Sequence, residues 1–96
     1  MAAGIWVKLI RHGRTLRDEM IPCARPDWQE ALTEACRLLD LQRPCVLPRH
    51  ERDFEQFGLA RFMPEHFIEA VHFDRMELEY IEPDSRKSGS VNEKYL

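Results

Sequence analysis

The sequence predicts a small α+β protein, in which a small antiparallel sheet packs against one amphipathic helix and a second short helix lies in the middle of the chain. Three patterns indicate this class: two strand-like segments around a glycine, a long helical repeat, and a late alternating segment. The 96 residues are 44% hydrophobic and 32% charged, as in one globular domain. We expect a single domain over residues 1–83 and a flexible C-terminal tail over residues 84–96, where apolar side chains are few.

The first two strands are expected to form a β-hairpin. Residues 5–10 are rich in β-branched and aromatic side chains, and residues 15–21 alternate between polar and apolar. Between them, His12-Gly13 supplies the glycine that a two-residue turn with positive φ requires. Pro22 cannot lie inside a central strand, so the second strand is expected to end near Ile21.

An amphipathic helix is predicted to begin after Asp27. Asp27 and Glu30 form an acidic variant of the capping box that marks a helix N-terminus. Cys36 falls on the apolar face and is expected to be buried as a small hydrophobic residue. The apolar face consists of residues spaced by three and four: Trp28, Ala31, Leu32, Ala35, Leu38 and Leu39.

A shorter helix is predicted after a buried apolar segment, Cys45-Val46-Leu47. It runs from Pro48 to residue 57, with Gly58 as its left-handed terminator. Residues 49–53 carry alternating charges and are interpreted as a solvated face. The residues expected to anchor this helix are Leu47, Phe54 and Phe57.

The end of the predicted domain contains a brief extended piece, a helical turn and a strand. Residues 59–63 are expected to be extended, and the turn from Pro64 directs Phe67 and Ile68 inward. Residues 71–81 form the strand, because Met76, Leu78 and Tyr80 alternate with glutamates. This strand is expected to pair beside the first one, which would place Lys8, Arg11 or Arg17 opposite Glu77, Glu79 or Glu82.

The net charge of −3 is too small to indicate a nucleic-acid, membrane or cationic partner. Its distribution is uneven, because residues 1–17 contain only basic charges and residues 51–84 are mostly acidic. Cross-strand pairing accounts for this division without a ligand. The alternative is a nucleic-acid-binding protein that uses the basic N-terminal hairpin, and the acidic later half counts against it. Its contact residues would be Lys8, Arg11, Arg14, Arg17, Arg49 and Arg52.

No metal site, cofactor or disulfide is predicted. Cys23, Cys36 and Cys45 lie 13 and 9 residues apart and form no Cys-x-x-Cys pair. The four histidines, His12, His50, His66 and His72, add no standard ligand spacing. The chain has no leader-like start and no apolar run of about 20 residues, so we expect a cytoplasmic protein without a membrane span.

One motif resembles an enzyme signature. Arg11-His12-Gly13-Arg14-Thr15, after the apolar Leu9-Ile10, is similar to the Arg-His-Gly-x-Thr motif of the histidine phosphatase superfamily. The resemblance implies a phosphoryl-transfer or hydrolytic enzyme in which His12 is phosphorylated and Arg11 binds phosphate. It covers seven of the 96 residues. The family also uses a second histidine, commonly before glycine, whereas His66 and His72 both precede phenylalanine.

The function we expect is therefore that of a non-catalytic binding or regulatory module acting through a protein partner. Arg11-His12-Gly13 is interpreted as the hairpin turn, and no catalytic, cofactor-binding or metal-binding residue is predicted. The phosphoryl-transfer enzyme and the nucleic-acid-binding protein remain the alternatives. The sequence leaves the partner and the oligomeric state open.

Overall fold

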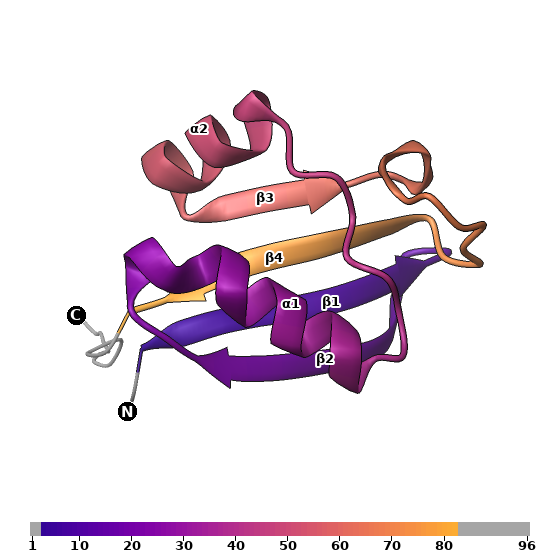
Figure 1. The fold of residues 1–96 in the computed structure, drawn as a ribbon. Helices are drawn as coiled ribbons and strands as arrows, with labels where there is room; N and C mark the ends of the chain where they lie inside the picture. Colours follow the sequence, from indigo (N-terminus) through magenta and orange to yellow (C-terminus); the bar gives the residue numbers. More distant parts are fainter. Residues whose placement is uncertain (1–2, 83–96) are drawn as a thin grey trace.

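The computed structural model describes residues 3–82, which form a four-stranded antiparallel sheet and two α-helices (Figure 1). This confirms the predicted α+β class. The tail predicted over residues 84–96 lies outside the described residues. The strands are β1 (Gly4–Arg11), β2 (Arg14–Pro22), β3 (Leu59–Phe62) and β4 (Arg75–Ile81), the helices are α1 (Trp28–Leu38) and α2 (Pro48–Phe57), and short 3-10 turns cover Arg25–Asp27 and Pro64–His66.

The sheet has the strand order β2-β1-β4-β3, so the last strand pairs with the first, as predicted. The register places Lys8 opposite Glu77, and the Lys8 Nζ lies 3.9 Å from the Glu77 carboxylate. The other predicted cross-strand pairings are not seen in this part of the chain. Arg17 lies in β2 opposite Leu9, and Glu79 lies opposite the uncharged Trp6.

The β1–β2 connection is the predicted two-residue turn. His12 and Gly13 both have positive φ, 54° and 76°, as the mirror-image turns that join hairpins require. The Asp74 carboxylate accepts a 2.8 Å hydrogen bond from the His12 backbone N–H, which fixes the tip of the hairpin to the start of β4. His12 and Gly13 therefore form the turn of the hairpin, and Arg11 is the last residue of β1.

Both helices cover one face of the sheet. In Figure 1, α1 crosses β1 and β2, and α2 lies along β3, which is the edge strand at the other end of the strand order. The rings of Trp28 and Phe54 stack with centroids 4.6 Å apart, which joins the two helices above the core. Neither helix in residues 3–82 has the length and apolarity needed to cross a bilayer. The strand residues that face the helices are Ile5, Val7, Leu9, Ala60, Phe62, Met76 and Leu78, all buried.

Helix α1 differs from its prediction at both ends. Asp27 makes no side-chain cap, because the preceding 3-10 turn holds its backbone at φ −96° and ψ 17° rather than in the extended conformation of a capping residue. Leu38 is 41% exposed, because Leu39 takes the buried position and a helix rotates about 100° per residue. Cys36 is buried as predicted, and burial raises the pKa of its thiol to about 11. All three cysteines are free.

Helix α2 ends before Gly58, whose φ of 68° confirms the left-handed terminator, and of its three predicted anchors only Phe54 is buried. Leu47 and Phe57 are exposed, and the buried residues are His50 and Phe54. Only a narrow stripe of α2 faces the core, at a spacing of four residues. His50 and Phe54 lie on this stripe, and the next position on it is Gly58 rather than Phe57. The segment before the helix is also more open than predicted, with an exposed Cys45.

The segment before β4 contains two further corrections. The strand begins at Arg75, so residues 71–74 are not part of it as predicted. The turn after Pro64 forms and buries Phe67, which packs edge-to-face on Phe73 at 5.4 Å. Ile68, however, is 80% exposed, because the chain bends after Phe67 and directs the next side chain outward.

The packing of α1 predicts a large difference between two leucines of one helix. Leu32 is fully buried, so Leu32→Ala should lower the free energy of unfolding by about 2 to 5 kcal/mol. The matched control Leu38→Ala should cost less than about 1 kcal/mol, because that side chain is partly exposed. Denaturant melts measure both values, and equal losses would contradict this placement of the helix.

The hairpin turn predicts opposite effects at its two central positions. His12→Asn should keep or raise the stability, because asparagine tolerates positive φ better than histidine. Gly13→Ala should cost about 1 to 2 kcal/mol from backbone strain alone, since no atom lies within 4 Å of the added Cβ. Thermal melts of the two variants test this, and a large loss in His12→Asn would show that the imidazole itself has a role.

Candidate functional site

The open face of the sheet carries charges that are paired with one another. Glu77 is the centre, with Arg75 Nε at 2.7 Å, Arg61 Nε at 3.7 Å and Lys8 Nζ at 3.9 Å. The hydrogen bond from Arg75 is the main cause that lowers the pKa of the Glu77 carboxyl. The Trp6 Nε1–H donates to Asp18 at 2.7 Å, and Lys8 lies over the Trp6 ring. These groups satisfy each other, so this face is a weak candidate for a charged ligand.

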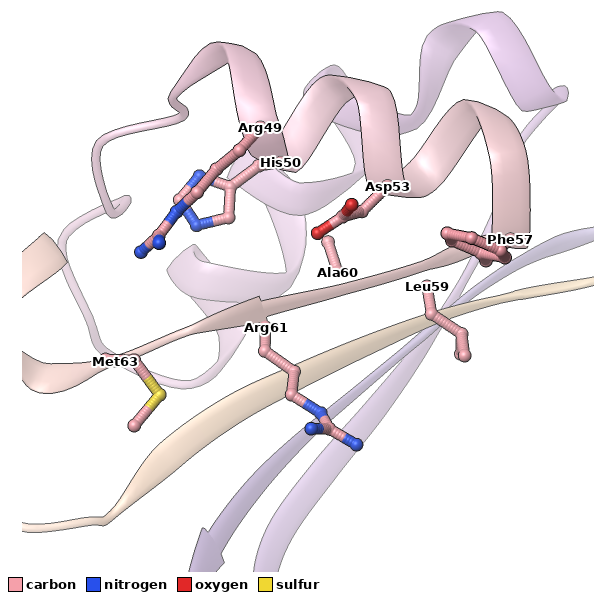
Figure 2. A pocket seen from close by; sticks show the side chains of 8 residues that line it. All are labelled: Arg49, His50, Asp53, Phe57, Leu59, Ala60, Arg61 and Met63. Carbon is pink, nitrogen blue, oxygen red and sulfur yellow. The ribbon is translucent and has the colours of Figure 1, made fainter.

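A groove with a volume of about 400 Å³ lies between α2 and the edge strand β3 (Figure 2). One wall is a helix stripe at a spacing of four, which shares one face of α2. The other wall is a set of strand positions at a spacing of two, which share one face of β3. The helix wall consists of Arg49, Asp53 and Phe57, the strand wall of Leu59, Arg61 and Met63, and His50 and Ala60 complete the lining.

The walls of this groove combine exposed apolar surface with a few charged side chains. Phe57 is 69% exposed, Leu59 48% and Met63 37%, which is unusual for large apolar side chains gathered in one place. Arg49 and Asp53 lie on the helix wall, whereas Arg61 extends from β3 away from α2 (Figure 2) and its Nε lies 3.7 Å from the Glu77 carboxylate. An apolar groove with a few charged groups is the ordinary form of a binding site.

Two histidines cap short helical segments next to this groove. Leu47-Pro48-Arg49-His50 and Met63-Pro64-Glu65-His66 share the pattern apolar-Pro-x-His. In each, the histidine Nδ1 accepts a 2.9 Å hydrogen bond from the backbone N–H three residues earlier. The ring therefore takes the place of the glutamate or glutamine that accepts this N–H from the third helical position of a capping box. The sequence analysis missed this repeat, although the spacing of the prolines and histidines is visible in the sequence.

The two capping rings pack against each other. Their centroids are 4.7 Å apart at an interplanar angle of 88°, and His50 also lies on Phe62 at 4.3 Å. His50 is 1% exposed and His66 is 7% exposed. The prediction that residues 49–53 form a solvated face is therefore wrong at His50, because contacts distant in sequence bury it. Burial first, and then the charges of His66 and Arg49, lower the pKa of His50.

The other residues named from the sequence lie elsewhere and apart. His12 and Arg11 are exposed at the hairpin tip, and the Asp74 carboxylate is used by the His12 backbone rather than by the exposed His72. Arg17 places its guanidinium 3.3 and 3.4 Å from the carbonyl oxygens at the end of α1. The structure therefore does not gather the basic residues into one surface. Within residues 3–82, no three metal-ligating side chains come together.

The chain matches no protein-family model, no curated protein and no solved structure. The α2–β3 groove and its histidines are therefore the basis on which a function is argued.

The lowered pKa of His50 predicts a loss of stability in mild acid. An unfolded histidine takes up its proton near the ordinary pKa of 6.5, whereas the folded one does so only at lower pH. Between these values the unfolded state holds more protons, so the free energy of unfolding should be at its full value above 6.5 and should fall as the pH decreases below it. Denaturant melts from about pH 8 to about pH 5.5 measure this slope.

The matched variant is His50→Asn, whose amide oxygen can still accept the hydrogen bond from the Leu47 N–H but does not titrate. It should lower the stability overall and reduce the pH slope. Glu77 also has a lowered pKa, but it titrates from its ordinary value of 4.5 downward, outside this window. An unchanged slope in His50→Asn would assign the pH dependence to another group.

Proposed function

We propose that the protein is a non-catalytic binding module that takes an extended segment of a protein partner into the α2–β3 groove. The observation that carries this proposal is the exposure of Phe57, Leu59 and Met63 along one groove. These large apolar side chains are partly in water. Covering them with a partner favours binding by roughly 25 cal/mol for each Å² of apolar surface that is buried.

The charge of the groove favours a particular kind of segment. The Arg49 guanidinium lies 2.8 Å from the His66 Nε2 rather than against an acid, so a segment that places an acidic side chain between apolar ones complements the groove. The shape favours an extended chain, because the groove runs along β3 and its strand wall has the two-residue spacing of an extended backbone. The partner in this proposal is thus an acidic and apolar peptide segment.

A cytoplasmic location belongs to the same proposal. Cys23, Cys36 and Cys45 are free, as is usual where thiols are kept reduced. The phosphoryl-transfer alternative has less support, because Arg11 and His12 form an exposed hairpin tip. The nucleic-acid alternative has less support as well, because Lys8 is paired with Glu77 and Arg17 lies at the end of α1.

Selection from a library of random peptides tests this function. Peptides enriched on the wild-type protein should combine acidic and apolar residues, and their binding should shift backbone NMR signals of α2 and β3. Phe57→Ser and Leu59→Ser should each weaken binding about tenfold or more, since a buried apolar side chain contributes about 1.5 to 3 kcal/mol. Both side chains are substantially exposed, so the fold should survive the substitutions.

Ile68→Ser is the matched control, because Ile68 is an exposed apolar residue outside the groove. It should leave peptide affinity unchanged. The proposal would be wrong if no peptide is enriched, if the enriched peptides bind the two groove variants as well as the wild type, or if the shifted signals lie on β1 and β2 instead of α2 and β3.

A further inference from the structure

Around His50 and His66, hydrogen-bond donors outnumber hydrogen-bond acceptors. A neutral imidazole has one donor and one acceptor nitrogen. Nδ1 of each ring is the acceptor, because it receives the backbone N–H of Leu47 or Met63 at 2.9 Å. The proton of each ring therefore lies on Nε2, and each Nε2–H needs an acceptor of its own.

Neither Nε2–H has an acceptor at full hydrogen-bond geometry among residues 3–82. The Arg61 backbone is only a minor acceptor for the buried His50 ring, because it raises the pKa of His50 less than burial lowers it. The His66 Nε2 lies 2.8 Å from a guanidinium nitrogen of Arg49, which can only donate. Whichever tautomer His66 adopts, one of two donors, the Arg49 guanidinium or the Met63 N–H, lacks an acceptor.

A group that supplies acceptor oxygens resolves this excess. We propose that Arg49, His50 and His66 form an oxyanion site that takes a carboxylate or phosphate group at the end of the α2–β3 groove. The guanidinium neutralises the anion and the imidazole N–H groups donate to its oxygens. Arg49 and His50 lie in the first turn of α2, where the positive end of the helix dipole also favours an anion.

The same donor count disfavours a metal ion as the occupant. A histidine that ligates through Nε2 normally donates its Nδ1–H to a nearby acceptor. Here each Nδ1 faces a backbone N–H donor, so ligation through Nε2 would break both helical caps. The site thus distinguishes an anion from a cation by the tautomer that the backbone imposes.

This inference goes beyond the proposed function, because the oxyanion site requires no peptide and is tested without one. In the proposed complex, the anion would be the acidic side chain of the partner segment. If the protein binds phosphate or acetate but no peptide, the oxyanion site is supported and the proposed peptide-binding function is not. If it binds peptides but neither anion, the proposed function is supported and the oxyanion site is not.

The experiment is an NMR titration of the whole chain above the ordinary histidine pKa of 6.5. Long-range proton–nitrogen spectra should show both His50 and His66 protonated on Nε2. Sodium phosphate and sodium acetate, added at constant ionic strength against sodium chloride, should shift these ring signals in a saturable way. Whichever salt binds more tightly identifies the preferred oxyanion, phosphate or carboxylate.

Arg49→Gln should weaken the binding of that anion about tenfold or more, because it removes a charge-assisted hydrogen bond. Arg52→Gln is the matched control, since Arg52 is exposed on the same helix, outside the groove, and carries the same charge. His66→Asn keeps an acceptor for the Met63 N–H and removes the Nε2–H, and it should also weaken binding.

Three results would overturn the proposal. The first is a response to phosphate and acetate no larger than the response to chloride. The second is an equal loss of affinity in Arg49→Gln and Arg52→Gln, which would indicate only general charge attraction. The third is a spectrum with the proton on Nδ1 in both rings. Arg49 is exposed, so the first two tests remain decisive even if His66→Asn does not fold.

Discussion

The pairing of β1 with β4 is the contact on which the rest of the structure depends. Without it, β1–β2 and β3–β4 would be two separate hairpins, and an isolated hairpin is at best marginally stable in water. Pairing the first strand with the last makes one sheet with one continuous apolar face. Both helices then have a surface to cover, and the Trp28–Phe54 stack closes the layer above it.

How much of this could be predicted from the sequence depends on how local the cause is. The hairpin turn, the apolar face of α1, the end of α2 at Gly58 and the alternation of β4 each follow from neighbouring residues, and all were predicted. The Asp27 cap was wrong, because whether a side chain caps depends on a backbone conformation that the preceding turn decides. The predicted exposure of His50 was wrong for a different reason, since this ring is buried by Phe62 and His66, which lie 12 and 16 residues later in the sequence.

The α2–β3 groove is a consequence of the same chain reversal. From the sequence alone, the polar stripe of α2 and the outward face of β3 are each expected to contact only water. Residues 49–53 were accordingly interpreted as a solvated face. Gly58 brings them side by side, because its left-handed conformation turns the chain from α2 directly into β3. The stripe from Arg49 to Phe57 is visible in the sequence. This stripe forms one wall of a groove only because the turn places β3 beside it. The position of β3 cannot be predicted from the periodicity of the sequence.

The two histidines show how a requirement of folding can leave a chemical group available for binding. Each ring is held as an acceptor by a backbone N–H, since a helical segment that begins with an apolar residue and proline has no side-chain oxygen of its own to cap it. That hydrogen bond fixes the tautomer and leaves the second nitrogen as a donor, buried in His50 and 2.8 Å from the Arg49 guanidinium in His66. A glutamate in place of each histidine, as in an ordinary capping box, could accept the same N–H and would leave no such donor. The proposed oxyanion site therefore depends on the use of histidine at both positions, together with Arg49 beside His66.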